Sequence, residues 1–402
     1  MNKSQEQRAT PLGNSFVSNA FWRMFPAGMR RRWWLFRFFD LIAKKIPMPW
    51  PRKGLVVVRM DGIGDMVLFR TSLDHYTEVF GVEMSEITII GCESWGAIAA
   101  EVFPNFRTLI INEHNFARRP LYRFWVSLKV RALNPAISVC DSYMRRVLMA
   151  DSLVWILGAS RTVSSLPFIN ERTRDEYMYY LSQVEEVVQT GHYPLHEVER
   201  HYNFLSSIAG SKINPVAPKI SWRQTKPSKH LVGCNTQYAV LNPGCNEYGR
   251  RWPLEKYQQL AQKIVDRGLK VIFIGGQDER LGKINKRGGK VIDLIGKTDL
   301  PQLLDLINHA KLVVSNDTGP AHLSIALQTP TLVVVGGGHF GCFVPYPQSI
   351  NPDHARFVYH KMDCYHCFWN CPKRESKYDV FPCIEAVEIS RVWEAADQLL
   401  SQ

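Results

Sequence analysis

The sequence lacks several features that would place it in a familiar class. No uninterrupted apolar run reaches the roughly 18 residues of a membrane-spanning helix. The polar stretch Asn2–Gln7 carries no secretory signal pattern, and the chain contains no short-period repeat or recognised nucleic-acid-binding module. These absences favour a cytoplasmic protein whose nine cysteines stay reduced, and they give no support for nucleic acid as a partner.

The composition favours two domains and anionic partners. The chain has 402 residues, of which 46% are hydrophobic, so it can build two cores of ordinary size. Lysine and arginine outnumber aspartate and glutamate by 49 to 37, which gives a net charge of +12. A basic surface of this kind attracts nucleotide phosphates, acidic glycolipids or an anionic membrane surface.

Residues 1–53 end in an unusual mixture of cationic and aromatic side chains. The residues that alternate there are the cations Arg23, Arg30, Arg31, Arg32, Arg37, Lys44 and Lys45 and the apolar residues Trp22, Phe25, Trp33, Trp34, Leu35, Phe36, Phe38, Phe39, Leu41 and Ile42. This composition is typical of a helix that lies in a bilayer interface. The alternative is a helix packed on the protein body with its basic residues in water.

After Gly54, predicted strands and helices alternate in two series. Apolar runs predict strands at 55–60, 87–90, 108–111, 136–140 and 161–163, and then at 238–241, 270–274, 291–294, 312–314 and 331–335. Helical patterns occur at 66–80, 174–209, 253–266, 300–309, 321–327 and 387–400. This alternation predicts two doubly wound α/β domains with parallel sheets. We expect these domains at 54–210 and 236–383, with a linker at 211–235 and a C-terminal helix at 384–402.

The loop Asp61-Gly62-Ile63-Gly64-Asp65 follows the first predicted strand, at the edge where parallel sheets bind ligands. Gly62 and Gly64 let a ligand approach the backbone, and Asp65 would aim its carboxylate into the crevice. A third glycine at dinucleotide spacing is missing, which argues against nicotinamide binding. The alternative for Asp65 is a simple helix N-cap.

The stretch Lys311–Leu323 predicts a sharp passage from a strand to a helix. Asp317 or Thr318 is the expected N-cap, and Gly319 lies in the turn. The free backbone N–H groups at the helix start can hold an anion such as a phosphate, and His322 would point near the same place. The alternative is a capped helix without a ligand.

A second anion-binding corner is predicted where Arg250 and Arg251 precede a helix. The same corner includes Asn242 and Gly244, which follow the first strand of the second series. Glu279, after the next strand, would reach a ribose or base at the same sheet edge. The alternative is a solvated basic turn.

Four cysteines, Cys364, Cys367, Cys371 and Cys383, lie within twenty residues. Their thiolates could form a tetrahedral structural site for zinc or iron. The alternatives are a reduced, packed loop or adventitious disulfides, since the paired Cys-x-x-Cys pattern of the strongest zinc signatures is missing.

Several motifs together resemble the heptosyltransferase family of lipopolysaccharide biosynthesis, glycosyltransferase family 9. The motifs are Asp61-Gly62-Ile63-Gly64-Asp65, Asn242-Pro243-Gly244, Arg250-Arg251-Trp252-Pro253, Gly275-Gly276 with Glu279, Leu294-Ile295-Gly296-Lys297-Thr298 and Ser315-Asn316-Asp317-Thr318-Gly319-Pro320-Ala321-His322. The resemblance covers roughly residues 54 to 400. It departs from the family where Gly336-Gly337-Gly338-His339 replaces the common Gly-Pro-Thr.

The resemblance implies a GT-B architecture, with two facing Rossmann-like domains for acceptor and nucleotide-sugar. It also implies inversion at the anomeric carbon, no catalytic metal and a donor that is typically ADP-heptose. Asp65 matches the general base of the family, and Arg250 stands where a lysine usually contacts the donor phosphates. Asp317, Thr318, Gly319 and His322 match the donor-binding turn.

These observations predict an inverting heptosyltransferase that is cytoplasmic and peripheral on the inner membrane. Its partners would be a nucleotide-sugar, a glycan or glycolipid acceptor and the anionic membrane surface. Two alternatives stay open at this point. One is a nucleotide-sugar epimerase of the same GT-B shape, and the other is a non-catalytic membrane-bound scaffold.

Overall fold

The computed structural model describes residues 31–402 except 172, 223–228, 234–235, 277–283 and 285–288. The expected features at residues 1–30 and at Glu279 therefore lie outside the described residues. The chain divides into two compact units. Unit 1 comprises Met1–Gly62, Ser72–Tyr193 and Glu197–Pro215, and unit 2 comprises Ile63–Thr71, Pro194–His196 and Val216–Gln402.

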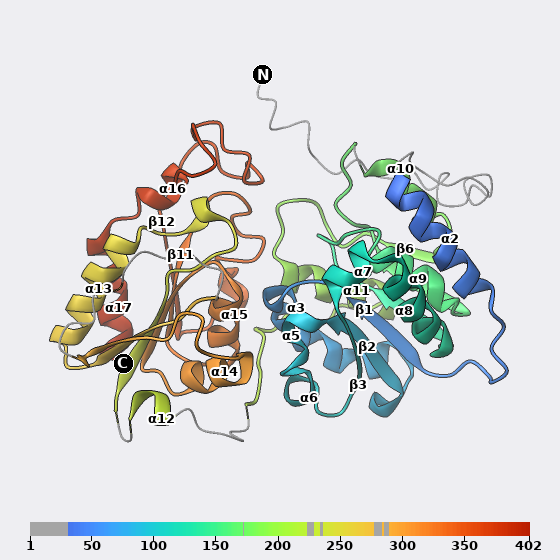
Figure 1. Ribbon diagram of the computed structural model, residues 1–402, viewed down its shortest axis with the longest axis horizontal. Coiled ribbons are helices and arrows are strands. Elements are labelled where there is room, and N and C mark those ends of the chain that lie inside the picture. The colour runs from blue at the N-terminus through green and yellow to red at the C-terminus, as the bar shows by residue number, and fades with distance from the viewer. Residues whose placement is uncertain (1–30, 172, 223–228, 234–235, 277–283, 285–288) are drawn as a thin grey trace. The chain divides into compact units, whose positions relative to one another are not determined.

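Unit 1 is built on a six-stranded sheet with the order β3-β2-β1-β4-β5-β6, in which every pair is parallel (Figure 1). Its strands are β1 (Leu55–Arg59), β2 (Ile87–Cys92), β3 (Arg107–Ile111), β4 (Ile137–Cys140), β5 (Arg161–Ser165) and β6 (Glu186–Val188). The central strand β1 is buried along its whole length, as expected for an apolar run with helices on both faces of the sheet.

The helices in this part of the chain differ from the predicted helices at two places. The α-helices of unit 1 are α2 (Arg31–Lys45), α4 (Tyr76–Phe80), α5 (Glu93–Gly96), α6 (Ala99–Val102), α7 (Glu113–Arg118), α8 (Pro120–Ala132), α9 (Ala150–Leu157), α10 (Arg174–Leu181) and α11 (Glu197–Ala209). The single helix predicted at 66–80 is wrong, because α3 ends at Arg70 and a 3-10 turn, Ser72–His75, separates it from α4. The continuous helical region predicted at 174–209 is also wrong, because the three-residue strand β6 lies between α10 and α11.

Unit 2 repeats the same topology with a second six-stranded parallel sheet, in the order β12-β11-β10-β7-β8-β9. Its strands are β7 (Tyr238–Asn242), β8 (Lys270–Phe273), β9 (Val291–Asp293), β10 (Leu312–Asn316), β11 (Thr331–Val335) and β12 (Ala355–Tyr359). When this sheet is read from β9 to β12, its strands follow the order third, second, first, fourth, fifth, sixth of their unit. The sheet of unit 1, read from β3 to β6, has the same order. This is the Rossmann order, and it confirms the predicted two-domain α/β fold.

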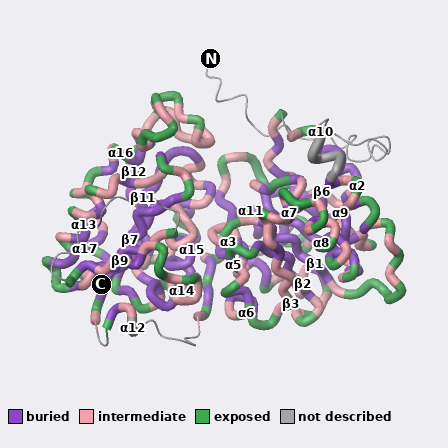
Figure 2. The backbone as a smooth tube through the Cα atoms, viewed as in Figure 1, coloured by how far each residue is buried: buried purple, intermediate pink, exposed green. Residues whose placement is uncertain are grey.

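The helices of unit 2 bury their apolar faces on this sheet. They are α3 (Ile63–Arg70), α12 (Lys229–Val232), α13 (Leu254–Asp266), α14 (Leu300–Asn308), α15 (Gly319–Ala326), α16 (Pro382–Glu385) and α17 (Ile389–Leu400). One core joins α13 and α17 to strands β7, β10 and β11. Figure 2 shows these strands as buried tubes and the helix surfaces as mixed. The strand β12 was not predicted, and its five residues show no strict alternation, because Phe357, Val358 and Tyr359 are all apolar or aromatic.

Among the described residues, no helix is both long enough and apolar enough to cross a bilayer.

Candidate functional site

The predicted passage from strand to helix is the centre of the candidate site. Strand β10 ends at Asn316, and α15 begins at Gly319 with Pro320 in its first turn. Thr318 is the N-cap in extended backbone, but its side chain makes no capping hydrogen bond. Pro320 has no N–H, and Ala321 N already donates to Thr318 O at 3.0 Å, so Gly319 is the first-turn residue whose backbone N–H can serve a ligand.

A neutral hydrogen-bond network fixes this turn to strand β7. The Asn242 Nδ2 atom donates to Ser315 Oγ and to Thr318 Oγ1, both at 2.9 Å. Asn242 is only 3% exposed, so these bonds satisfy an amide that water does not reach. The Thr318 side chain is consequently engaged below the helix start, which explains why it does not cap α15.

Asn316 ties the same turn to the loop that carries the arginines. Its Nδ2 atom donates to Pro243 O at 2.9 Å and to Gly244 O at 3.3 Å. Its Oδ1 atom accepts from the backbone N–H of Trp252 at 3.0 Å. The predicted residue Gly244 thus contributes a backbone carbonyl that positions the loop.

Arg250, Asp317 and His322 form a charged row above this network. The Arg250 Nη2 atom lies 2.9 Å from Asp317 O and 3.1 Å from Asp317 Oδ2. The other carboxylate oxygen of Asp317 lies 3.6 Å from His322 Nε2. Burial opposes the ionisation of Asp317, but the hydrogen bond from His322 and the charge of Arg250 lower the pKa of its carboxyl group. The structure therefore brings Arg250, predicted from one motif, together with Asp317 and His322, which were predicted from another.

Two residues that were not predicted as site residues adjoin this row. The His339 side chain is largely buried near Arg250, and both effects lower its pKa to about 4. Tyr346 stacks on His322 with ring centroids 6.4 Å apart and an interplanar angle of 23°. His339 follows the three glycines that depart from the family pattern, and this departure was the only sequence signal for it.

Asp65 lies in the first turn of α3, which packs on α15 within unit 2. The contact is close: a Cβ atom at Gly64 would lie 2.8 Å from His322 Cδ2, and one at Gly319 would lie 3.1 Å from Ile63 Cβ. Because α3 begins at Ile63, Asp65 is inside the helix, and its alternative interpretation as an N-cap is wrong. Asp65 and the turn at Asp317–His322 therefore belong to one compact unit.

Asp61 is held in unit 1 by partners of its own. Its Oδ2 atom lies 2.9 Å from Arg59 Nη2 and accepts a hydrogen bond from Ser142 Oγ at 2.6 Å. Its backbone carbonyl accepts from Trp95 Nε1 at 3.3 Å. Gly62, the next residue, is the last one of this segment in unit 1. Asp61 thus anchors the loop at one end.

Arg251 points away from the charged row. Its Nε and Nη2 atoms donate to Cys245 O at 2.9 and 2.7 Å, so its guanidinium braces the loop of residues 243–251. Arg250 and Arg251 were predicted as one pair, but only Arg250 contacts Asp317.

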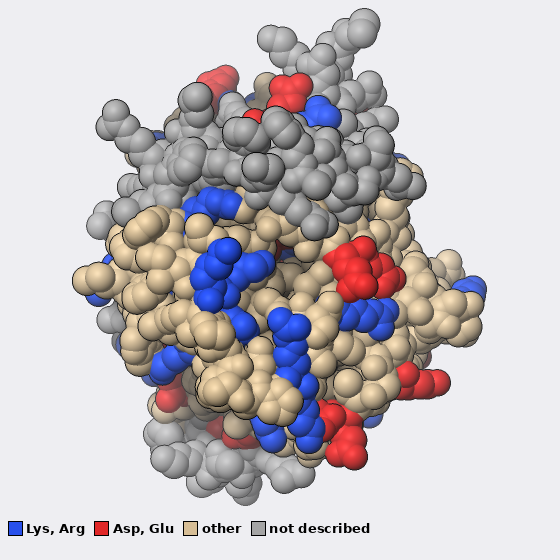
Figure 3. Space-filling view, turned by 90° about the vertical axis from the view of Figure 1, so that its right-hand side faces the viewer, with Lys and Arg blue, Asp and Glu red and all other residues tan. Residues whose placement is uncertain are grey.

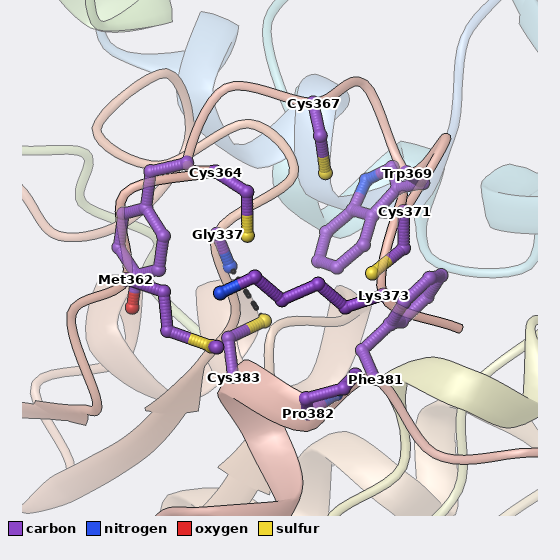
Figure 4. Close-up of a pocket in the computed structure, with 11 residues that line it drawn as sticks. Gly337, Met362, Cys364, Cys367, Trp369, Cys371, Lys373, Phe381, Pro382 and Cys383 are labelled. Carbon is purple, nitrogen blue, oxygen red and sulfur yellow. Dashed lines mark hydrogen bonds between the residues drawn. The ribbon is translucent and has the colours of Figure 1, made fainter.

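The four clustered cysteines line a small pocket in unit 2 (Figure 4). Gly337 N donates to Cys383 Sγ at 3.4 Å, and the Lys373 side chain extends among the sulfur atoms. Burial raises the pKa of the Cys367 thiol to about 11. Within the part of the chain that the structure describes, no three His, Cys, Asp or Glu side chains are arranged to hold a metal ion.

Comparisons with known proteins agree with the geometry. Residues 170–368 match the model of glycosyltransferase family 9, the heptosyltransferases. Lipopolysaccharide heptosyltransferase 3 of Escherichia coli is 28% identical over 125 residues, which cover 30% of this chain and 37% of that protein. The lipopolysaccharide core heptosyltransferase OpsX of Haemophilus influenzae is 22% identical over 288 residues, 70% of this chain and 78% of that protein.

The fold has a counterpart among solved structures. The E. coli ADP-heptose lipopolysaccharide heptosyltransferase II superposes with a TM-score of 0.63 at 15% identity, over 87% of this chain and 99% of that one. The structural match therefore covers nearly the whole length of the solved heptosyltransferase II. The sequence match to heptosyltransferase 3 spans little more than a third of that protein.

Proposed function

Because the chain belongs to glycosyltransferase family 9, the heptosyltransferase family, we propose that it transfers a heptose or a related sugar from a nucleotide-sugar, ADP-heptose being favoured. The acceptor would be a saccharide or a lipid-linked glycan of lipopolysaccharide or another surface glycan. The observation that carries this proposal is the row of Arg250, Asp317 and His322 beside the helix start of α15. Arg250 and His322 can contact the diphosphate of a nucleotide-sugar, while the Asp317 carboxylate holds the Arg250 guanidinium in place.

The reaction would proceed by a single displacement. The acceptor hydroxyl oxygen bonds to the anomeric carbon while the bond from that carbon to the diphosphate oxygen breaks. Asp65 takes the hydroxyl proton, and attack from the face opposite the diphosphate inverts the anomeric centre. Arg250, the His322 side chain and the Gly319 N–H at the start of α15 would stabilise the negative charge on the leaving diphosphate, so the step would need no catalytic metal.

The Asp65→Asn variant tests this assignment. It should bind ADP like the wild type but lose transfer by about 10²- to 10⁴-fold, because the amide cannot accept the proton. ADP release in the presence of heptose-poor lipopolysaccharide measures transfer, and isothermal titration measures ADP binding. The Asp266→Asn variant, at an exposed position of α13, is the matched control. Unchanged transfer by Asp65→Asn would contradict its role as the base.

The same assays separate the two alternatives. An epimerase would convert the nucleotide-sugar when no acceptor is present. A non-catalytic scaffold would show no rise in melting temperature with ADP or ADP-heptose, whereas ligand binding to the folded state stabilises it by mass action.

We also propose that Cys364, Cys367, Cys371 and Cys383 bind one structural zinc or iron ion. Three thiols of one loop and that of Cys383 in α16 line one pocket, and thiolates are ligands that both metals favour. The cationic Lys373 beside them would offset the negative charge of the thiolates. The ion would crosslink the loop and would take no part in the transfer step.

Metal analysis of purified protein tests this site. The wild type should contain about one equivalent, and the Cys364→Ser/Cys367→Ser double variant should contain much less. A Cys92→Ser/Cys140→Ser double variant removes two buried thiols of unit 1 and should keep the metal. Negligible metal in all three proteins would overturn the proposal.

A second surface, on unit 1, supports peripheral association with an anionic membrane. Helix α2 is fastened to α8 by a fully buried ion pair, with Asp40 Oδ2 2.6 Å from Arg123 Nη2. Among the side chains of these two helices that the structure describes, the exposed apolar ones are Phe38, Leu41, Ile42, Leu121 and Trp125. Phe38, Leu41 and Ile42 follow the spacing of one helix face. The helix is thus packed on the body, as in the alternative interpretation, but it keeps an apolar stripe.

Cations accompany this stripe. Lys45, Arg118, Arg119 and Lys129 are exposed, and the Lys129 ammonium lies 3.5 Å from the Trp125 ring centroid. Figure 3 views the side of the molecule that carries α2 and shows Lys and Arg side chains among uncharged residues. Exposed aromatic residues next to cations are suited to an anionic headgroup layer.

Vesicle co-sedimentation tests this surface. The wild type should bind vesicles that contain phosphatidylglycerol and leave pure phosphatidylcholine vesicles unbound. The Phe38→Ser/Leu41→Ser variant should lose this binding, while Tyr378→Ser, a matched change at a 70% exposed residue of unit 2, should retain it. Equal binding by all three proteins would contradict the assignment.

A further inference from the structure

The three glycines at 336–338 lie under aromatic rings of the cysteine loop, residues 364–383. A Cβ atom at Gly337 would lie 2.3 Å from Tyr365 Cδ1, and one at Gly338 would lie 2.2 Å from Trp369 Cδ2. A Cβ atom at Gly336 would also lie 2.9 Å from the Trp369 ring. Side chains at these positions are excluded by the space that the rings fill. The glycines that replace the common Gly-Pro-Thr of the family therefore make room for the rings of the cysteine loop.

Backbone hydrogen bonds hold the cysteine loop on this glycine run. His366 N donates to Gly337 O at 2.7 Å, and Phe368 N donates to Gly338 O at 3.0 Å. Trp369 also packs on Phe381, with ring centroids 5.2 Å apart. The Trp369 ring is thus fixed from two sides.

The same loop reaches the turn that carries Arg250. The Arg250 Cζ atom lies 4.5 Å from the Trp369 ring centroid. Phe381 N donates to Gly249 O at 2.8 Å, and the Arg374 Nη1 atom lies 2.8 Å from Glu247 Oε1. The cysteine loop therefore contacts the turn of residues 247–250 at two points, Arg374 and Phe381.

Arg250 is consequently held on two sides, by the Trp369 ring and by Asp317. Its side chain is 26% exposed, so the guanidinium is still accessible to a ligand. Its Nε atom is buried and has no hydrogen-bond partner among the described residues. A guanidinium that is fixed before the ligand arrives loses less conformational entropy on binding.

We propose that Trp369 is a positioning residue that presents Arg250 to the diphosphate of the donor. The inference rests on the proposed function and deepens it, because it makes the cysteine loop a wall of the donor site. The glycine run leaves space for the rings of the cysteine loop, and one of these rings, that of Trp369, orients Arg250.

ADP binding, measured by isothermal titration, tests this proposal. Trp369→Leu should weaken ADP binding about tenfold, because it removes the cation–π contact that holds Arg250. Trp369→Phe should keep most of the affinity, since its ring still faces the guanidinium. The matched control is Trp393→Leu, which removes a tryptophan–lysine contact between α17 and α13 and should leave ADP binding unchanged.

A double-variant cycle with Arg250→Ala separates positioning from a general loss of structure. If Trp369 acts through Arg250, Trp369→Leu should cause no further loss of affinity in the Arg250→Ala background. A full tenfold further loss there would overturn the inference. With the complete reaction, Trp369→Leu should raise the KM for the donor and leave kcat nearly unchanged.

The outcomes also distinguish this inference from the proposed function. Failure of the wild type to bind ADP, or full ADP binding by Arg250→Ala, would overturn the proposed donor site itself. Weaker binding by Arg250→Ala together with wild-type binding by Trp369→Leu would overturn only the role of Trp369.

Discussion

The two sheets share one strand order, but the side chains at the point where that order reverses are charged in unit 1 and neutral in unit 2. In unit 1, between β1 and β4, Arg59 lies 2.7 Å from Asp141 and 2.9 Å from Asp61. In unit 2, between β7 and β10, Asn242 donates to two hydroxyl groups. The same topology therefore carries buried charges in one unit and a neutral network in the other.

This difference explains why the anion site is expected in unit 2. The charge of Arg59 is already neutralised by two carboxylates, and His201 Nδ1 lies 2.8 Å from Asp141 as well. Although burial opposes ionisation, His201 and Arg59 keep the pKa of Asp141 far below its usual range. In unit 2 Arg250 also pairs with a carboxylate, that of Asp317, but this pair lies at the rim above a neutral network, where the 26% exposed Arg250 side chain can still contact a ligand.

The largest effect is expected from breaking the charged network of unit 1. Asp141→Ala should lower the free energy of unfolding by about 3–5 kcal/mol, because it leaves Arg59 and His201 buried without this partner. Urea denaturation measures the loss. Glu186→Ala, which removes the half-exposed pair with Arg161, should cost about 1 kcal/mol or less. Equal losses of unfolding free energy in the two variants would contradict the claim that burial makes the Asp141 network costlier to break than the exposed pair.

A smaller effect is expected from the neutral network of unit 2. Asn242→Ala should cost about 1–3 kcal/mol, since it leaves two hydroxyl groups without a donor but no buried charge. The same urea experiment compares it directly with Asp141→Ala. A loss as large as that of Asp141→Ala would remove the proposed contrast between the two units.

The smallest effect concerns pH and His339. The folded-state pKa of this residue, about 4, lies below its ordinary value of 6.5, so between these values the unfolded chain binds a proton that the folded chain does not. Stability should therefore fall as pH falls through this window, by about 1 kcal/mol between pH 7 and 5.5. His339→Gln should remove this part of the pH dependence of the melting temperature. An unchanged pH profile in the variant would contradict the assignment.

The sequence predicted the local features of the site better than its long-range ones. The turn at Asp317–His322 was predictable because a strand end, a cap and a helix start follow one another along the chain. The pairing of Arg59 with Asp141 and the approach of Trp369 to Arg250 were not predicted, because each joins residues about 80 or more positions apart. β6 was missed because three residues are too few to show an alternating pattern.

Helix α3 has a consequence for the order in which the protein can fold during synthesis. It leaves the ribosome with the first strand of unit 1, but its packing partner α15 is made roughly 250 residues later. A nascent chain must therefore keep the apolar side of α3 uncovered while unit 1 is forming. For the same reason, a fragment that begins at Val216 would lack α3 and would leave α15 uncovered beside the turn at Asp317–His322.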